Sequence, residues 1–382
     1  MPAHLASWSR TGRRGALVVV AFLAISSAPA FASDTTSPGG YASSVPMAPR
    51  LQWDPNFGYC GETSMIMAGM RFGQYTSQWT ARRLASARTN QTLEASQLLL
   101  GVSPPDGNAV TAATGMRLNM VSYDSAQPSN TPGYLAWIKQ HVVQGDSVTI
   151  GMLTNRNILG QDTPGDSEYD HIVPVIRVSS EQPLEGANAG TYFPTDTLTI
   201  NDLETPRGNT ADNPAGSTLY TYRFDAVQKT RRQANRGSGP ENLYSVLKAS
   251  GADGSNYAVA VTGVTDTSPG GPYVIPVAVT SSRTNEGLPT TDPMRTPPRA
   301  KSMTLTVTVT IPDSAKAYRL YEYTNFKSVP RGSFNAAAAG SPRSVAHVWE
   351  IPVGTGPTYA LRLPRVSTAG TYVFRAVPTS AP

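Results

Sequence analysis

The sequence has little cysteine, little charge and few histidines, and each scarcity excludes a class of protein. Cys60 is the single cysteine among 382 residues, so no disulfide can form within the chain. One cysteine and four scattered histidines give no zinc-site pattern, and we expect neither a metal nor a cofactor. Charged residues make up only 15% of the chain and the basic ones form no long run, so we expect no nucleic-acid partner.

The N-terminal segment, residues 1–32, has the pattern of a secretory signal peptide. Three arginines precede an apolar stretch at 16–25, and Ala30-Phe31-Ala32 forms a small-x-small cleavage site. The apolar stretch is too short to span a bilayer comfortably, so we expect cleavage rather than stable membrane insertion. The sequence therefore predicts a secreted, extracellular protein, or a periplasmic one if the host is Gram-negative.

Helical patterns come first in the mature chain and strand patterns follow. Residues 33–50 are rich in Ser, Thr, Pro and Gly and predict a flexible leader. Apolar spacings of three and four predict helices at 61–72, 77–86, 93–100, 108–116 and 131–143. Apolar or alternating runs predict strands at 148–153, 171–178, 197–201 and 219–224. Helices followed by strands indicate an α+β domain, which we place at residues 51–250.

A polar, glycine-containing break near residue 250 marks a change to strands alone. Seven short strands are predicted after it, at 257–264, 274–280, 302–311, 317–323, 345–353, 358–363 and 370–377. Short strands separated by turn residues are typical of a β-sandwich of the immunoglobulin or fibronectin type. We therefore expect an all-β sandwich domain at residues 251–382, which gives the chain two domains.

Cys60 lies in the segment Gly-Tyr-Cys-Gly-Glu-Thr-Ser, directly before the helical pattern at 61–72. Free amide groups and a partial positive charge at a helix N-terminus favour a thiolate. Gly61 would leave the approach to that terminus open. Secreted proteins usually use cysteine in pairs, so an unpaired thiol is buried, joined to another chain or functional. A buried small residue at a helix start remains the alternative to a reactive nucleophile.

A nucleophilic thiol needs a general base, and His171 is the best placed of the three histidines after residue 32. It begins a predicted strand, and a rigid strand suits a general base. His141 closes an amphipathic helix, where its protonated form would interact favourably with the helix C-terminus. His347 lies in the predicted C-terminal module. The alternative for His171 is a strand-end residue whose ring bonds to neighbouring backbone.

The strand at 197–201 ends in two candidates for the group that orients the imidazole. Asp202 shares its side with Leu198 and Ile200 if the alternation continues, whereas Asn201 would face the other way. We prefer Asp202, because a carboxylate also stabilises an imidazolium, and keep Asn201 as the alternative. Both residues are also common at turns that end strands. Gln52 carries an amide that would suit an oxyanion, although a single glutamine is a weak signal.

The order of these elements resembles the C39-like branch of the papain-fold cysteine peptidases, over residues 51–247. The elements are a glutamine, then Tyr-Cys-Gly-x-x-Ser opening a helix, then Asp-His-Ile-Val-Pro-Val on a strand, then Ile-Asn-Asp. The resemblance implies a papain-like fold with N-terminal helices and an antiparallel sheet. It also implies that Cys60 is the nucleophile, His171 the general base, Asp202 its orienting acid and Gln52 an oxyanion donor.

The resemblance implies a thiol-dependent hydrolase that cleaves peptide or other amide bonds in a peptide or protein substrate. Transglutaminase-like acyl transfer uses the same three groups and is one alternative. A catalytically inactive papain-like domain that binds a surface or polymer is another. Glu62 favours the hypothesis of an inactive binding domain, because it stands where the family usually has proline and its charge would disfavour a thiolate at Cys60.

Overall fold

The structure of the protein is a computed structural model, and its described residues belong to one compact unit, Ser37–Pro382. It describes residues 40–52, 58–86, 96–101, 107–124, 130–155, 169–203, 218–230, 233, 243–248, 255–265, 275–286, 299–330 and 345–379. The predicted signal peptide at 1–32 lies outside these ranges. The fold is mixed α+β, with more strand than helix, as the sequence predicts at this coarse level.

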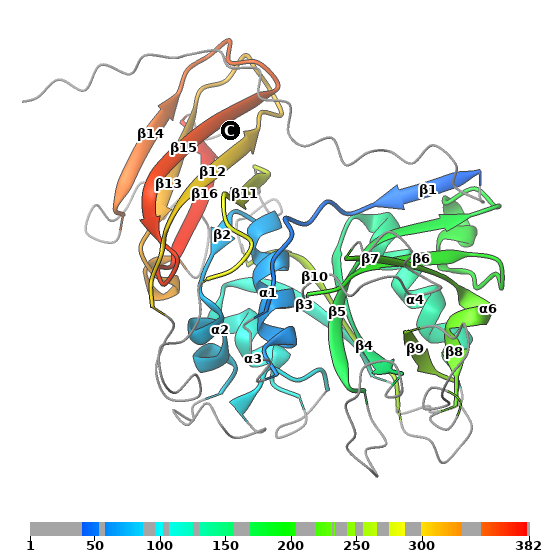
Figure 1. Ribbon diagram of the computed structural model, residues 1–382. Helices are drawn as coiled ribbons and strands as arrows, with labels where there is room; N and C mark the ends of the chain where they lie inside the picture. The colour runs from blue at the N-terminus through cyan, green and yellow to red at the C-terminus, as the bar shows by residue number, and fades with distance from the viewer. Residues whose placement is uncertain are drawn as a thin grey trace, which may run out of the picture. The chain divides into compact units, whose positions relative to one another are not determined.

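The larger sheet contains the strands that carry the candidate site. Within the described residues its strands are β1 (Tyr41–Ser44), β3 (Leu118–Asp124), β4 (Ser147–Thr154), β5 (His171–Ser180), β6 (Thr197–Asn201), β7 (Leu219–Arg223), β8 (Gln228–Lys229), β9 (Tyr244–Leu247) and β10 (Tyr257–Val264). The main order is β3-β10-β4-β5-β6-β7, with β1 beside β5 and β9 joining β4 to β8 (Figure 1). All pairs are antiparallel except β8 with β9.

The middle of this sheet is covered on both faces. Every residue of β4 and most residues of β5 are buried. Pro174 lacks an amide hydrogen, and the sequence predicts an edge position or a bulge around it. The structure has the bulge, because the register of β5 with β6 shifts between Val175 and Arg177. The strand thus stays inside the sheet, and His171 stands at its first position.

The helices follow the sequence periodicity closely. They are α1 (Cys60–Arg71), α2 (Gln78–Ala85), α3 (Ala109–Gly115), α4 (Thr131–Gln144) and α6 (Phe224–Val227), with 3₁₀ turns η2 (Gly186–Gly190) and η3 (Phe326–Ser328). The helix expected at 93–100 falls partly outside the described residues, and its described part contains no α-helix. No helix in the described ranges combines the length and apolar character needed to cross a membrane.

Two further antiparallel sheets are formed mainly by the C-terminal residues. Their strands are β2 (Gln74–Tyr75), β11 (Val277–Ser281), β12 (Ser302–Thr310), β13 (Tyr318–Tyr323), β14 (His347–Ile351), β15 (Thr358–Ser367) and β16 (Tyr372–Pro378). One sheet has the order β11-β12-β15 and the other the order β14-β13-β16-β2. Leu305 and Val307 of the first share a buried core with Leu320 and Phe374 of the second. The two sheets therefore pack against each other across that core.

Six of the described strands lie where the sequence did not place them, and three of these, β3, β8 and β9, belong to the larger sheet and fall in no predicted strand range. The strand Tyr257–Val264, assigned above to the C-terminal module, is β10 and pairs with β3 and β4 of the larger sheet. The leader at 33–50 contains β1, which pairs with β5. Residues 74–75, inside the predicted α+β domain, form β2 and pair with β16. Alternation identifies a strand but not its partner, and strands of two to four residues are too short to show alternation.

Helix α1 lies between the larger sheet and the C-terminal sheets and is buried from Cys60 to Met70. Met65 and Met67 belong to the core of the larger sheet, whereas Ile66 and Met70 belong to the core of the C-terminal sheets. A helix that is buried all round depends on neighbours on every side. The helix that begins at Cys60 is therefore oriented by both parts of the molecule.

Replacing Ile66 by alanine is expected to lower the free energy of unfolding by about 2–5 kcal/mol, because it leaves a cavity between α1 and the C-terminal sheets. Urea denaturation followed by circular dichroism measures this loss. Val348→Ala is the matched control, since Val348 is 48% exposed on β14 and should change stability by less than about 0.5 kcal/mol. An equally small effect for Ile66→Ala would contradict the shared packing.

Candidate active site

Cys60 is the first residue of α1, where the sequence predicts it, and it forms no disulfide. The first amide groups of a helix have no partner within the helix, so they remain available at this terminus. Cys60 is 9% exposed, which leaves a small part of the side chain accessible. The thiol thus lies at the positive end of a helix that packing holds in place.

His171 and Asp202 meet at the same place in the fold. Nε2 of His171 lies 3.2 Å from Oδ1 of Asp202, and both side chains are almost fully buried. Burial is the largest influence on the pKa of His171 and lowers it. Hydrogen bonding and charge interactions with Asp202 and Cys60 act against burial, and together they raise the pKa of His171 well above 6.5. The imidazole therefore interacts with a carboxylate through Nε2, which leaves Nδ1 for the thiol.

Tyr244 of β9 contributes to this site although the sequence did not indicate it. Its hydroxyl donates a hydrogen bond to Oδ2 of Asp202 at 2.8 Å. Its ring stacks on the His171 ring, with centroids 5.7 Å apart and an interplanar angle of 27°. Asp202 thus has one carboxylate oxygen bound to the imidazole and the other bound to Tyr244. The backbone amide of Asp202 also donates to the carbonyl of Thr218 at 2.7 Å, which fixes the residue further.

Gln52 lies at the same end of β6 as Asp202. Its backbone amide donates to the carbonyl of Leu203 at 2.8 Å, one residue beyond Asp202. Gln52 is buried, with 6% of its surface exposed. Asn201 is the last residue of β6 and pairs with Leu219, and it forms no hydrogen bond with His171. Of the two alternatives for the orienting residue, Asp202 is the one in contact with the imidazole.

The charge of Glu62 is balanced by a buried arginine. Nε of Arg82 lies 2.6 Å from Oε1 of Glu62, and neither side chain is exposed. The same carboxylate oxygen accepts a hydrogen bond from the amide of Leu98 at 3.0 Å. Arg82 also donates to the carbonyl of Gly58 and lies over the Tyr59 ring, 3.5 Å from its centroid. The expected opposition of Glu62 to a thiolate is therefore offset by a cation beside the same helix terminus.

Gly61 has a different role from the one that the sequence indicated. A Cβ atom at this position would lie 2.0 Å from the carbonyl oxygen of Leu98 and 3.1 Å from a side-chain carbon of Ile172. The space beside Gly61 is thus filled by protein and is not an open approach. Ser64, one turn later, donates from its hydroxyl to the carbonyl of Ile172 at 3.4 Å. These contacts hold α1 against β5, so the residue beside His171 also fixes the helix of Cys60.

The arrangement combines a thiol, an imidazole and a carboxylate that are held by three different elements. Such a set can move a proton between sulfur and imidazole while the carboxylate stabilises the imidazolium. In the described residues no group of three or more histidine, cysteine or acidic side chains is placed to hold a metal ion. Tyr244 and Arg82 were missed because neither belongs to a motif, and no strand was predicted at Tyr244.

Comparisons of the chain with protein-family models, with curated proteins and with solved structures found no match.

Asp202→Asn is expected to lower the pKa of His171, because it removes a negative charge from a buried imidazole and keeps the side-chain size. NMR titration of the imidazole protons measures the shift, with His171→Ala identifying the signal. Asp196→Asn is the control: Asp196 is buried beside Lys139 and precedes the opposite end of β6. An unchanged His171 pKa in Asp202→Asn would show that the carboxylate does not control the imidazole.

Tyr244→Phe is expected to lower the free energy of unfolding by about 1.5–3 kcal/mol, because a buried carboxylate oxygen loses a donor. Tyr134→Phe is the comparison, since the Tyr134 hydroxyl donates to the neutral carbonyl of Tyr257 at 3.0 Å. Its loss is expected to cost about 0.5–1.5 kcal/mol. Chemical denaturation of both variants tests the assignment, which would be wrong if Tyr244→Phe were the milder change.

Proposed function

We propose that the protein is a thiol-dependent hydrolase of amide bonds, with peptides or proteins as substrates. The observation that carries this proposal is the His171 imidazole, which interacts with the Asp202 carboxylate and with the Cys60 thiol. A carboxylate on one side of a buried imidazole and a thiolate on the other both favour the protonated imidazole. The thiolate is the form of cysteine that attacks a carbonyl carbon. We propose a papain-like fold of the C39-like type for the α+β part and an immunoglobulin- or fibronectin-like sandwich for the C-terminal sheets.

The proposed reaction has two steps that use the same residues. The Cys60 sulfur attacks the amide carbon, and the carbonyl π electrons move onto oxygen to form the oxyanion. As that oxyanion collapses, the C–N bond breaks and His171 gives its proton to the departing amine. Water then attacks the thioester while His171 accepts a proton from it, and breaking of the C–S bond releases the acid and regenerates Cys60. Asp202 orients the imidazole and stabilises its charged form.

The oxyanion of each step needs hydrogen-bond donors that are in place before the reaction. The Cys60 amide is one proposed donor, because it belongs to the first turn of α1. The Gln52 side chain is the second, because its backbone is bound next to Asp202. The balanced charge of Glu62 favours an active thiol over an inactive binding domain.

Cys60→Ala is expected to reduce hydrolysis by about 10³-fold or more, since the nucleophile is lost. Mass spectrometry of a mixed peptide library incubated with the purified protein measures hydrolysis. Adding a primary amine acceptor in a parallel reaction separates hydrolysis from acyl transfer, because transfer yields an amine adduct. Hydrolysis that persists in Cys60→Ala would refute the proposal.

Alkylation of Cys60 by iodoacetamide tests the thiol without a substrate. At pH 6 an ordinary thiol with a pKa of about 8.5 is almost wholly protonated and reacts slowly. Because the His171 imidazole can accept the thiol proton, Cys60 should react faster than N-acetylcysteine. His171→Ala should remove this advantage, because alanine cannot accept the proton of the thiol. A wild-type rate no higher than that of N-acetylcysteine, together with no peptide cleavage, would favour the inactive binding protein.

A further inference from the structure

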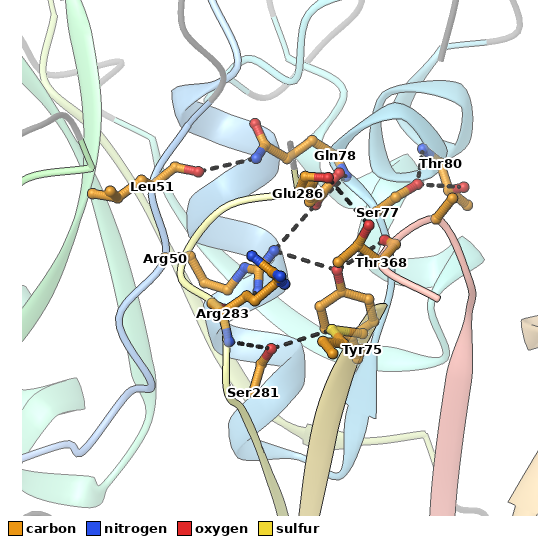
Figure 2. Close-up of polar contacts among 12 residues, drawn as sticks. Arg50, Leu51, Tyr75, Ser77, Gln78, Thr80, Ser281, Arg283, Glu286 and Thr368 are labelled. Carbon is orange, nitrogen blue, oxygen red and sulfur yellow. Dashed lines mark hydrogen bonds and ion pairs between the residues drawn. The ribbon is translucent and has the colours of Figure 1, made fainter. Parts of the chain in front are cut away.

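The backbone before Gln52 is bound to parts of the chain that are far away in sequence. The Leu51 amide donates to the carbonyl of Thr284 at 2.8 Å. The Leu51 carbonyl accepts from Nε2 of Gln78 at 3.1 Å (Figure 2). The Gln52 amide in turn donates to the carbonyl of Leu203. The segment that carries the proposed oxyanion donor is thus held between the residues that follow β11, helix α2 and the end of β6.

A buried ion pair holds the residue before Leu51. Arg50 and Glu286 are both fully buried, and their side chains lie 3.3 Å apart. Arg50 also donates to the carbonyl of Arg283 at 3.1 Å and to the Tyr75 hydroxyl at 3.3 Å. Figure 2 shows Arg50 between Glu286 and Tyr75, and its guanidinium carbon lies 4.9 Å from the centre of the Tyr75 ring. These contacts join the residue before Leu51 to Tyr75 of β2 and to Arg283 and Glu286, which follow β11.

Glu286 connects this ion pair to the start of α2. Both of its carboxylate oxygens accept hydrogen bonds from the backbone amide of Gln78, the first residue of α2, at 2.8 and 2.9 Å. A negative charge is favourable at this end of a helix. The backbone carbonyl of Glu286 accepts from the Thr368 hydroxyl at 3.1 Å, and the Thr368 carbonyl accepts from the Tyr75 hydroxyl at 2.9 Å. The Gln78 amide thus holds the carboxylate of Glu286, and Thr368 holds its backbone.

A buried ion pair is weak evidence of net stability, because removing two charges from water costs about as much as their attraction returns. It does restrict the chain to one arrangement, because a charge left alone in the interior is unfavourable. Here the arrangement includes the backbone at Leu51 and Gln52. The contacts of Arg50 and Glu286 therefore bear on the position of Gln52.

We propose that Glu286 is a positioning residue for the oxyanion side of the active site. It holds Arg50 and the start of α2, and these fix the backbone from which the Gln52 amide reaches the substrate oxygen. The C-terminal sheets would then contribute to hydrolysis by holding the active site in place. This inference rests on the proposed function.

The positioning is expected to depend on pH. Burial raises the pKa of Glu286 to about 7, while Arg50 and the Gln78 amide act against that rise. Arg50, Tyr75 and Tyr59 are the titratable groups that interact with this carboxylate. Because the folded pKa is raised to about 7, the carboxylate is about half charged near pH 7, and its attraction to Arg50 weakens as the pH falls through that value.

A double-mutant cycle between Glu286→Gln and Gln52→Ala tests the inference. Glu286→Gln keeps the side-chain size but removes the charge, and it should lower kcat for peptide hydrolysis by about tenfold or more with KM nearly unchanged. The rate of Cys60 alkylation should stay the same, because alkylation needs no oxyanion donor. In the Gln52→Ala background, Glu286→Gln should add less than about a twofold loss, since the donor it positions is already absent.

Two further variants keep the test decisive. Arg50→Lys retains the positive charge but loses the forked contact to Arg283 and Tyr75, and it should reproduce the loss in kcat if Glu286→Gln does not fold. Asp196→Asn breaks a buried ion pair with Lys139 in another part of the protein and should leave kcat unchanged. In the wild type, the ratio of hydrolysis to alkylation should fall as the pH drops through about 7, and Glu286→Gln should abolish this fall.

The outcomes separate the two proposals. Multiplicative losses in the double mutant, or an alkylation rate that falls in parallel with hydrolysis, would overturn the positioning role and indicate a purely structural one. Hydrolysis that is independent of Cys60 in the otherwise unchanged protein would instead overturn the proposed function, and this inference with it. Cys60-dependent hydrolysis with non-additive losses supports both.

Discussion

The complete burial of α1 is the constraint on which the rest of the structure depends. Glu62 and Ser64 lie near the start of this buried helix, and a buried polar group without a partner is unfavourable. Glu62 finds Arg82 and the Leu98 amide, and Ser64 finds the carbonyl of Ile172. These bonds fix the rotation of the helix about its axis. The direction of the Cys60 side chain is therefore set by the polar residues that follow it.

The C-terminal sheets add charges that complement the ends of two helices. Arg375 of β16 donates to the carbonyl of Phe72, which caps the C-terminus of α1, and to Oε1 of Gln74. Burial lowers the pKa of Arg375 to about 10, so the guanidinium remains charged near neutral pH. Glu286 supplies the opposite charge at the N-terminus of α2. Because a positive charge favours a helix C-terminus and a negative charge an N-terminus, these contacts attach both helices to the C-terminal sheets.

The sequence predicted helices and strands where apolar residues recur at a regular spacing. The apolar spacing at 61–72 identified α1, and the alternation at 197–201 identified β6 and the preference for Asp202 over Asn201. Partners were not readable, because a strand pattern such as Tyr257–Val264 is compatible with either sheet. Contacts between side chains that are far apart in the sequence could not be predicted either. Tyr244 reaches Asp202 across 42 positions, and no local pattern encodes that distance.

The single cysteine, Cys60, lies where packing limits its exposure. Under the proposed export the chain meets an oxidising environment, in which a thiolate exchanges with disulfides when another sulfur can approach it. Cys60 is only 9% exposed, and the loop residue Leu98 packs against Gly61 beside it. Limited exposure restricts which groups can reach the sulfur. The contacts that hold α1 in place therefore also limit access to the thiol.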